Sequence, residues 1–310
     1  MLSILIPIYN RFVVSLVDQL HTQAGRLDVP CEIVLVDDAS TDAVRKVNRQ
    51  FCVDQFQCRL FELRENHGPA FVRNCLVKLA HYPYLLFLDA DTRPIADDFL
   101  SQYLRLAQQG RVVCGGFRYV PMTKEYRERH HTALRYKYGV KVESEPASVR
   151  KRRPYQHFIS MNFFVPREVM LRIPFDETFH LGYEDTAFGK QLADAGISIL
   201  HIDNDVWHLI IEDTTQFLAK TARAVRNLIG HETELQSYVR LLAAYRFLKR
   251  CGAVRATAWL YRQLETRIIR HLLGTNPRLI VFAFYKLGVF CCLIKEESLP
   301  LRAPAKQETL

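Results

Sequence analysis

Two carboxylates, Asp89 and Asp91, follow the apolar run Tyr84–Leu88 directly. A short apolar run of this kind predicts a buried strand, so both carboxylates would lie at its carboxyl end. Carboxylates in such a place can hold a hard divalent cation together with the ligand that accompanies it. An exposed acidic turn is the alternative, because two acids around one residue are common by chance. The position after a buried strand favours the metal site.

A further acid, Asp38, follows the apolar run Glu32–Val36. A carboxylate there could accept a hydrogen bond from a nucleotide base or bind a ribose hydroxyl. Helix capping is the alternative, for which Ser40, Thr41 and Asp42 are well suited. Both can hold, with the later residues capping the helix and Asp38 pointing at the ligand.

The segment 66–74 opens a predicted helix and contains two candidate residues. Gly68 permits a close approach of the backbone to a ligand. Arg73 could reach a phosphate or a base, or it could anchor Asp38, and its place in the sequence favours neither.

Glu184 and Asp185 also open a predicted helix. Acids at a helix N-terminus are favoured by the helix dipole, so capping is the alternative to chemistry. A general base at this place would deprotonate an acceptor hydroxyl. His208 stands alone in the sequence. It is a metal-ligand candidate because the acidic motif at Asp91 lacks a nitrogen partner.

These residues need a scaffold that brings them together, and the first hundred residues predict one. Four short apolar runs, at 2–8, 32–36, 59–63 and 84–88, alternate with segments of helical spacing. Such alternation predicts an α/β fold with a mostly parallel, Rossmann-like sheet that is covered by helices on both faces. Ligands bind such sheets outside the carboxyl ends of the strands, where Asp38, Asp89 and Asp91 are placed.

The rest of the chain is less regular. Strands are predicted at 112–119, 158–165 and 197–202, and helices over nearly all of 215–294, broken near Gly230, Gly252 and Pro277. Residues 120–157 have no clear pattern. The basic run Arg150–Arg153 is either a loop that closes over a phosphate or a solvated surface, with the second slightly favoured.

The composition excludes several classes of protein. The 310 residues are 49% hydrophobic and 24% charged, which rules out a disordered or low-complexity chain. No apolar stretch reaches the about 20 uncharged residues of a spanning helix, which rules out a multispan membrane protein. Eight cysteines without C-x-x-C spacing, and an apolar start that predicts a strand rather than a signal peptide, indicate a reducing, cytoplasmic location.

The motifs, taken in order, carry a resemblance to a known family. They are SILIPIYNR, IVLVDDAST, NHGPAFVRN, YLLFLDADT, SMNFFVPRE, GYEDTAFGKQL and HIDNDVWHL. This collinear set resembles glycosyltransferase family 2, a group of inverting, nucleotide-sugar-dependent enzymes with the GT-A fold. The resemblance covers residues 1–215. It implies a GT-A domain there, and the helical pattern beyond it predicts a C-terminal helical extension over 216–296 and a flexible tail over 297–310.

The resemblance also implies a role for each candidate. Asp38 would bind the base with support from Arg73, Asp89 would lie near the ribose, and Asp91 and His208 would coordinate Mg²⁺ or Mn²⁺ on the diphosphate. Asp185 would be the catalytic base, with Glu184 beside it on the acceptor hydroxyls. Further residues would line the donor and acceptor sites: Pro7, Tyr9, Asn10 and Gly68 for the nucleotide-sugar, and Asn162 and Phe163 for the sugar and acceptor.

The implied activity is metal-assisted transfer of a sugar, with inversion, to a hydroxyl of a glycan or lipid-linked acceptor in cell-surface polysaccharide synthesis. Departures from the family pattern limit the expectation: there is no Q-x-x-R-W signature and no array of spanning helices, which argues against a processive polymerase. A nucleotidyltransferase on a related fold is one alternative, but the loop at 7–11 lacks its glycines. A basic nucleic-acid-binding protein is another, supported by charge alone, and no nucleic-acid partner is expected.

The net charge of +9 is concentrated in residues 221–310, where 15 basic residues face 6 acidic ones. Within this part, Leu279–Ile294 is apolar on every face apart from Lys286. It is either a helix buried against residues 216–273 or another subunit, or a helix in the membrane interface. In the second case Arg262, Arg267, Arg270, Arg278 and Lys286 would meet anionic lipid on the inner face of the cell membrane.

Overall fold

The computed structural model describes residues 1–107, 110–179 and 182–297. Its centre is a seven-stranded sheet with the order β3-β2-β1-β4-β8-β6-β9. The strands are β1 (Leu2–Ile8), β2 (Cys31–Asp37), β3 (Arg59–Glu62), β4 (Tyr84–Leu88), β6 (Val112–Cys114), β8 (Asn162–Pro166) and β9 (Ile199–His201). Only β8 runs antiparallel to its neighbours among these strands, so the expected mostly parallel sheet is confirmed.

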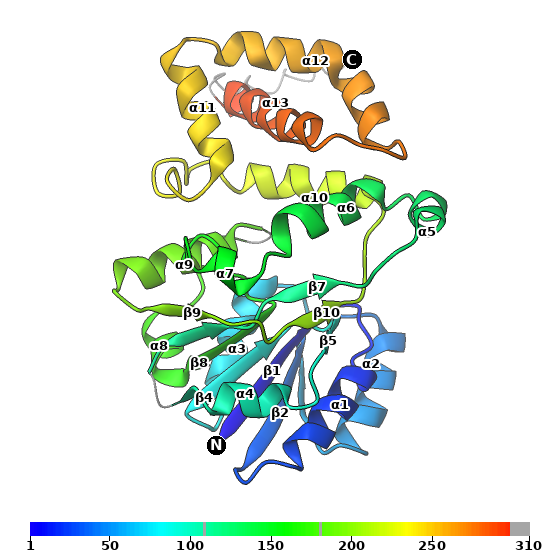
Figure 1. Ribbon diagram of the computed structural model, residues 1–310, viewed down its shortest axis with the longest axis vertical. Helices are drawn as coiled ribbons and strands as arrows, with labels where there is room; N and C mark the ends of the chain where they lie inside the picture. The colour runs from blue at the N-terminus through cyan, green and yellow to red at the C-terminus, as the bar shows by residue number, and fades with distance from the viewer. Residues whose placement is uncertain (108–109, 180–181, 298–310) are drawn as a thin grey trace, which may run out of the picture.

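Helices cover both faces of this sheet (Figure 1). One face packs against α1 (Val14–Ala24) and α4 (Phe99–Leu104). The other packs against α3 (Pro69–Leu79), α8 (Arg167–Arg172) and α9 (Glu184–Asp194). Side chains of β1 alternate between the two cores, with Ile4 and Ile6 on one side and Leu5 on the other. Each such side chain contributes about 1.5–3 kcal/mol by leaving water, which explains why the apolar runs form strands.

A second, three-stranded sheet was not expected from the sequence. It has the order β5-β10-β7, built from β5 (Thr92–Pro94), β10 (Val206–His208) and β7 (Phe117–Tyr119). The strand expected over 112–119 is therefore two strands in different sheets. The break falls at Gly115 and Gly116. Gly116 has φ +86°, which is not a strand conformation, and Gly115 has no room for a side chain because a Cβ there would lie 2.0 Å from Tyr103 Oη.

The irregular middle of the chain forms short helices beside the sheets. These are α5 (Lys124–Arg129), α6 (Ala133–Tyr138) and α7 (Ala147–Arg150), with a π-helical turn at Gly139–Glu143; α2 (Asp42–Asn48) continues into a second π-helical turn at Arg49–Val53. Within the basic run, Lys151, Arg152 and Arg153 are exposed, in line with the favoured expectation of a solvated surface, whereas Arg150 departs from it. Arg150 is 3% exposed and donates hydrogen bonds to the carbonyl oxygens of Cys114, Gly115 and Ile202, so it anchors β6 and β9.

Four helices form a layer at the opposite end from the N-terminus (Figure 1). They are α10 (Thr214–Arg226), α11 (Arg240–Arg250), α12 (Val254–Leu272) and α13 (Leu279–Glu297). Helix α13 ends at Glu297, and residues 298–310 of the expected tail lie outside the described residues. Two hydrophobic cores lie within this layer, and both include residues from the first part of the chain. Phe179 and Ala187 belong to one core, and Leu134 belongs to the other. The domain boundary at 215/216 stays a prediction.

Helix α13 resolves the alternative for the apolar segment Leu279–Ile294. Phe282, Tyr285, Phe290 and Cys291 are buried among the other helices of the layer, so α13 is a core helix. Lys286 does not reach out to a lipid surface, because its ammonium lies over the rings of Tyr138 and Phe282. Among the described helices, none is both long and apolar enough to cross a bilayer.

Candidate active site

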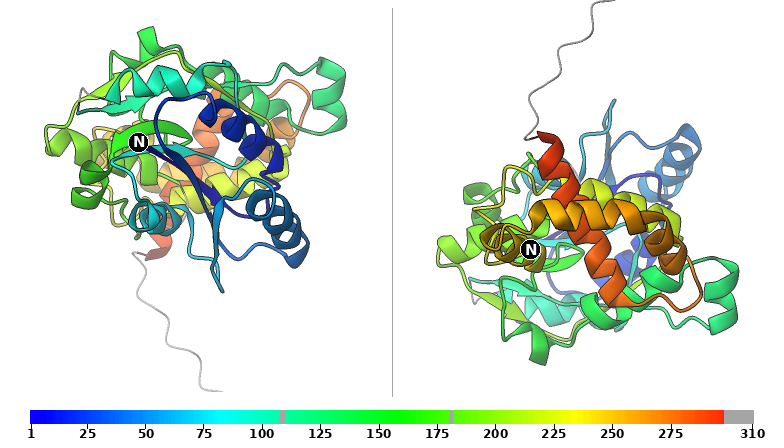
Figure 2. Two further views of the ribbon diagram at one scale, coloured as in Figure 1. Left: turned by 90° about the horizontal axis from the view of Figure 1, so that it is seen from below. Right: turned by 90° about the horizontal axis from the view of Figure 1, so that it is seen from above.

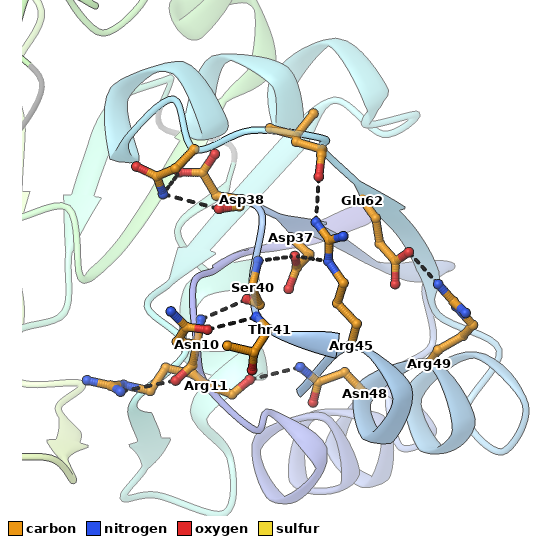
Figure 3. A network of polar contacts seen from close by, with 12 residues as sticks. Asn10, Arg11, Asp37, Asp38, Ser40, Thr41, Arg45, Asn48, Arg49 and Glu62 are labelled. Carbon is orange, nitrogen blue, oxygen red and sulfur yellow. Dashed lines mark hydrogen bonds and ion pairs between the residues drawn. The ribbon is translucent and has the colours of Figure 1, made fainter. Parts of the chain in front are cut away.

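Hydrogen bonds between the ends of β1 and β2 build the first side of the site (Figure 3). The backbone N–H of Asn10 donates to Ser40 Oγ at 2.7 Å, and the N–H of Thr41 donates to Asn10 Oδ1 at 2.9 Å. Asp37 accepts from the N–H of Ser40 and from Arg45, which fixes the same loop. These bonds hold the segment 7–10, with its half-buried Pro7 and Asn10 and exposed Tyr9, at the carboxyl edge of the sheet.

Asp38 lies at this edge, but its carboxylate is already engaged. It accepts from Asn66 Nδ2 at 2.8 Å, from the N–H of His67 at 2.8 Å and from the N–H of Gly68 at 2.9 Å. Gly68 has φ +89°, a conformation that favours glycine, and it precedes α3. Asp38 thus positions the loop that leads into α3, and its direct contact with a base stays a prediction.

Arg73 corrects one expectation. Its Nη2 donates to Asp89 Oδ1 at 2.8 Å, so it supports Asp89 rather than Asp38. Arg73 is buried, and its guanidinium lies 5.5 Å from the centre of the Phe175 ring. Burial raises the pKa of Asp89 above its usual value, and the positive charge of Arg73 opposes this rise. The pair joins α3 to the end of β4.

Glu184 and Asp185 form the first turn of α9, as expected. The two residues before them, Gly182 and Tyr183, have φ of +79° and +70°, so the chain turns sharply into the helix. A Cβ on Gly182 would lie 2.7 Å from Ala224 Cβ of α10, which shows how closely the helical layer supports this turn. Asp185 Oδ2 accepts from the N–H of Ser160 at 3.1 Å, and its other oxygen is buried without a hydrogen-bond partner.

The electrostatics of this turn are unusual. Burial raises the pKa of Glu184 to about 7, the negative charge of Asp185 adds to the rise, and Arg73 opposes it. The charges of Asp89, Asp185 and Glu184 act together on Arg73 and keep its pKa above the usual value, although burial opposes this. The base candidates on α9 and the Arg73–Asp89 pair therefore belong to one electrostatic group.

Asp91 and His208 also come together, through the small sheet. In the pairing of β5 with β10, His208 lies opposite Thr92, and the N–H of Leu209 donates to the carbonyl of Asp91 at 2.9 Å. His208 Nε2 lies 3.4 Å from Asp91 Oδ2, and Arg11 Nε lies 3.9 Å from the same oxygen. Burial opposes ionisation of Asp91, but His208 and Arg11 outweigh it and hold the pKa of Asp91 below its usual value.

This pair fits a divalent cation. Two neighbouring ligands of an octahedral ion lie roughly 3 Å apart, close to the distance between His208 Nε2 and Asp91 Oδ2. Within the described part of the chain, no group of three or more histidine, cysteine, aspartate or glutamate side chains could hold a metal ion. The chain thus offers one oxygen and one nitrogen donor, and the remaining ligands would come from a bound diphosphate and water.

Aromatic side chains hold His208 in place, and sequence reasoning missed them. The ring of Tyr119 lies 5.1 Å from that of His208, measured between centres. Tyr119 Oη donates to Glu143 Oε2 at 2.5 Å, and Arg135 donates to the same oxygen at 2.8 Å. Arg135 also lies 4.9 Å from the centre of the Phe217 ring on α10. Arg135 and Glu143 fall in the segment without a pattern, so no sequence signal pointed to them.

Asn162 and Phe163 were expected near the sugar and acceptor, and the structure contradicts both. Asn162 Nδ2 donates to the carbonyls of Gly116 and Asn204, and its Oδ1 accepts from Tyr103 Oη. Asn162 therefore ties β8 to the two neighbouring loops. Phe163 is fully buried and stacks on Phe87 in the sheet core. Neither side chain is available to a ligand.

Several buried polar atoms without a hydrogen-bond partner gather at this edge of the sheet. They are Arg73 Nε and Nη1, Glu184 Oε2 and Asp185 Oδ1, on three residues whose charges act on one another. Buried polar groups in folded proteins are nearly always paired, so a cluster of unpaired donors and acceptors indicates a place for a polar ligand. The acceptors suit hydroxyl groups, the guanidinium suits an anion, and the Asp91–His208 pair suits a cation that accompanies the anion.

The sequence profile described as glycosyl transferase family 2 matches residues 3–174. An uncharacterized glycosyltransferase of Haemophilus influenzae is 29% identical over 119 residues, which are 36% of this chain and 44% of that protein. The putative teichuronic acid biosynthesis glycosyltransferase TuaG of Bacillus subtilis is 31% identical over 94 residues, 30% of this chain and 36% of that protein. The chain therefore matches less than half the length of either relative.

Solved structures share the fold over nearly the whole chain. The mannosyltransferase PcManGT of Pyrobaculum calidifontis, in complex with GDP-Man and Mn²⁺, superposes with a TM-score of 0.55 at 17% identity, covering 96% of this chain and 86% of that one. Residues 1–349 of S. aureus TarS, in complex with UDP-GlcNAc, superpose with a TM-score of 0.50 at 16% identity, covering 96% and 90%. At these identities the likeness shows the fold alone.

Proposed function

The chain belongs to glycosyl transferase family 2, and from this premise we propose that it is an inverting, metal-assisted glycosyltransferase. It moves a sugar from a nucleoside-diphosphate sugar to a hydroxyl of a glycan or lipid-linked acceptor. One observation carries the proposal: buried polar atoms without a hydrogen-bond partner belong to Arg73, Glu184 and Asp185, whose charges act on one another beside the end of β4. The carboxyl edge is where an α/β sheet binds its ligands.

The donor is assigned to the side of the site that β1, β2 and α3 build. Pro7, Tyr9 and Asn10 line the nucleotide, and the loop that Asp38 holds brings the N-terminus of α3 beside it. Asp89, fixed by Arg73, takes the ribose. The fold is also that of proteins solved with GDP-Man and Mn²⁺ or with UDP-GlcNAc, which supports this class of donor.

The base is assigned to Asp185 Oδ1. Ser160 holds the other oxygen of this carboxylate, so Oδ1 is oriented and has no hydrogen-bond partner that would compete with an acceptor hydroxyl. As the hydroxyl oxygen forms its bond to the anomeric carbon, its proton passes to Oδ1. The bond from that carbon to the diphosphate breaks on the opposite face and leaves its electron pair on the diphosphate, which inverts the configuration.

Asp91 and His208 are assigned to hold Mg²⁺ or Mn²⁺. When bound there, the ion would neutralise the charge that grows on the leaving diphosphate. Arg11 adds a fixed positive charge beside Asp91. A retaining mechanism would need a further carboxylate as nucleophile, and we assign Glu184 instead to the acceptor hydroxyls.

The acceptor class is proposed from the named relative. TuaG of Bacillus subtilis is named as a putative glycosyltransferase of teichuronic acid biosynthesis. We assign this chain to the same broad class of pathway, in the cytoplasm, where it would add a sugar to a growing glycan or to a lipid-linked precursor.

A panel of nucleotide-sugars tests the proposal. Each is added to the protein with Mn²⁺, with Mg²⁺ or with EDTA, and the melting temperature and the release of nucleoside diphosphate are measured. We expect one nucleotide series to raise the melting temperature, because a ligand that binds only the folded state stabilises it, and we expect the metal to increase the effect. Stabilisation by nucleoside triphosphates with release of pyrophosphate, and none by nucleotide-sugars, would instead indicate a nucleotidyltransferase.

The pH dependence of the reaction tests the pair on α9. Because Glu184 titrates near pH 7 in the free protein, we expect kcat/KM to fall as the pH drops through about 7 and Glu184 takes up a proton. In the Glu184→Gln variant this titration is removed, so kcat/KM should no longer change around pH 7 and should stay near the value that the wild type has when Glu184 is protonated. A wild-type profile that is flat from pH 6 to about 8 would contradict the assignment, since such profiles report the free enzyme's essential groups.

The raised pKa of Glu184 also affects the stability of the folded protein. The folded pKa of Glu184 lies above the ordinary value of 4.5, so the folded protein binds the proton more tightly than the unfolded chain. Stability should therefore decrease as the pH rises from about 4.5 to 7, by linkage. Glu184→Gln should remove this part of the dependence, and urea unfolding at several pH values would measure it.

A further inference from the structure

Helix α12 is the outermost element of the helical layer (Figure 1). Its buried side chains, Ala258, Tyr261, Ile268 and Leu272, face the body of the protein, and α12 packs mainly on α13. The view from above shows α12 crossing over α13 at this end of the molecule (Figure 2, right). The opposite face of α12 is therefore the outer surface of this end.

That outer face carries a stripe of cations with one aromatic. Helical geometry of 100° per residue places five exposed residues within an arc of about 80°. They are Arg255, Trp259, Arg262, Thr266 and Arg270. Trp259 is 63% exposed, although a large apolar ring is costly to leave in water. Arg267 and Leu260, both exposed, lie beyond one edge of the stripe.

The charge around the stripe is almost entirely of one sign. Residues 240–278 contain nine arginines or lysines, all exposed, and a single acid, Glu265, which accepts a hydrogen bond from Tyr261. The nine are Arg240, Arg246, Lys249, Arg250, Arg255, Arg262, Arg267, Arg270 and Arg278. Such a field attracts an extended anionic surface.

We propose that the outer face of α12 docks the protein on an anionic lipid bilayer. Two features point to lipid rather than to another anion. Exposed tryptophan beside arginine is the pairing found at the boundary between headgroups and acyl chains. Exposed Phe247 and Leu273 add apolar side chains to the same basic layer, which a bilayer can accept and water cannot stabilise.

The docking is peripheral, since the apolar face of α12 is already occupied by α13. Arginines would meet the headgroup phosphates and Trp259 would enter the interface, without insertion of the helix. The inference replaces the expectation that α13 meets the lipid, because the basic residues lie on α11, α12 and the loop at Arg278 and not around a lipid-facing α13. It is independent of the proposed function, since docking requires no sugar transfer.

Vesicle sedimentation tests the proposal with the full chain. Vesicles of phosphatidylcholine alone are compared with vesicles that contain increasing phosphatidylglycerol, at several salt concentrations. We expect no binding to phosphatidylcholine, binding that rises with phosphatidylglycerol, and weaker binding at high salt, because salt screens exposed charges. A wild type that sediments with neither kind of vesicle at low salt would overturn the proposal.

A charge variant tests the surface. Each arginine near an anionic bilayer contributes about fivefold in affinity, so Arg255→Gln, Arg267→Gln and Arg270→Gln together should weaken binding about 100-fold. The matched control, Arg26→Gln, Lys78→Gln and Arg172→Gln, changes three exposed cations outside the helical layer and should bind like the wild type. Equal loss in both variants would mean that overall charge, not this face, is responsible. Melting temperatures confirm that both variants fold.

Tryptophan fluorescence supplies a readout of contact. The chain has two tryptophans, Trp207 and Trp259. Anionic vesicles should shift the emission of the wild type to shorter wavelength as Trp259 leaves water, and Trp259→Phe should abolish the shift. A shift that persists in Trp259→Phe would overturn the assigned face. Binding of single-stranded DNA with no binding of vesicles would also overturn the proposal and identify the face as a nucleic-acid surface.

Discussion

Replacing Asp185 by asparagine should lower kcat by about 10³-fold, within the range that a general base usually contributes. Asparagine has nearly the same shape and can still accept the hydrogen bond from the N–H of Ser160, so α9 should begin as before. It cannot take a proton from an acceptor hydroxyl. Because the donor lies against β1, β2 and α3 in the proposed arrangement, its dissociation constant should change little. Steady-state kinetics and calorimetric titration of the nucleoside diphosphate would measure both quantities.

Glu184→Gln is the matched control for this prediction, because it makes the same chemical change at the neighbouring residue. It removes a like charge from beside Asp185 and should change the pH profile more than the maximal rate. If Glu184→Gln is the more damaging of the two at high pH, the roles of the pair are reversed. If neither variant loses more than a few-fold in kcat, the base does not lie at the start of α9.

The turn that places this pair could be predicted only in part. The acids at a helix start are visible in the sequence, and α9 begins at Glu184, the first acid of the pair that was expected to open it. The close approach of Gly182 to Ala224 is not visible in the sequence, because it joins segments that are far apart in the chain. Local sequence shows which residues prefer a helix N-terminus, whereas tertiary packing decides which other element, here α10, lies against them.

The strands show the same division. β1 and β4 have the expected bounds. A continuous apolar run between polar residues is most stable when both of its faces are buried, as in a parallel sheet covered by helices. β5 and β10 were missed because three residues are too few to show a period. Yet their pairing brings His208 to Asp91, so part of the candidate metal site depends on elements that no pattern predicts.

The wrong assignments in the site have a related cause. A strand alternates its side chains between faces, and a motif in a strand does not say which face meets the ligand. Phe163 turns into the sheet core and Asn162 ties loops together. Arg73 was correctly singled out but given the wrong partner, since an arginine buried one turn into a helix can reach the end of either neighbouring strand. The charge of Arg150 suggested a surface, and five oxygen and nitrogen acceptors around it hold it inside.

The second large effect is expected at Asp91. Asp91→Asn should weaken metal-dependent binding of the nucleoside diphosphate by more than about 100-fold, since loss of even an outer partner of a metal site costs 10–100-fold. Binding without metal should change far less, and it should improve slightly if the negative charge of Asp91 repels the diphosphate. Asp97→Asn, an exposed acid of the same loop region, is the matched control and should behave like the wild type. Calorimetric titration with UDP and with GDP, each in Mn²⁺ and in EDTA, measures the four dissociation constants for each protein.

His208→Ala separates a metal site from a simple ion pair. In this structure Asp91 is held by His208 and Arg11, so removing His208 from an ion pair would only raise the pKa of Asp91 toward its usual value. In that case Asp91 would stay ionised near neutral pH in the His208→Ala variant. Nucleotide binding by the variant would then be the same with and without Mn²⁺. If His208 is a metal ligand, His208→Ala instead weakens the Mn²⁺ affinity itself, which manganese paramagnetic resonance measures without any turnover. Loss of Mn²⁺ affinity in both Asp91→Asn and His208→Ala, with nucleotide binding in EDTA retained, is therefore the result that the proposed site requires; an unchanged manganese titration in both would remove the metal from it.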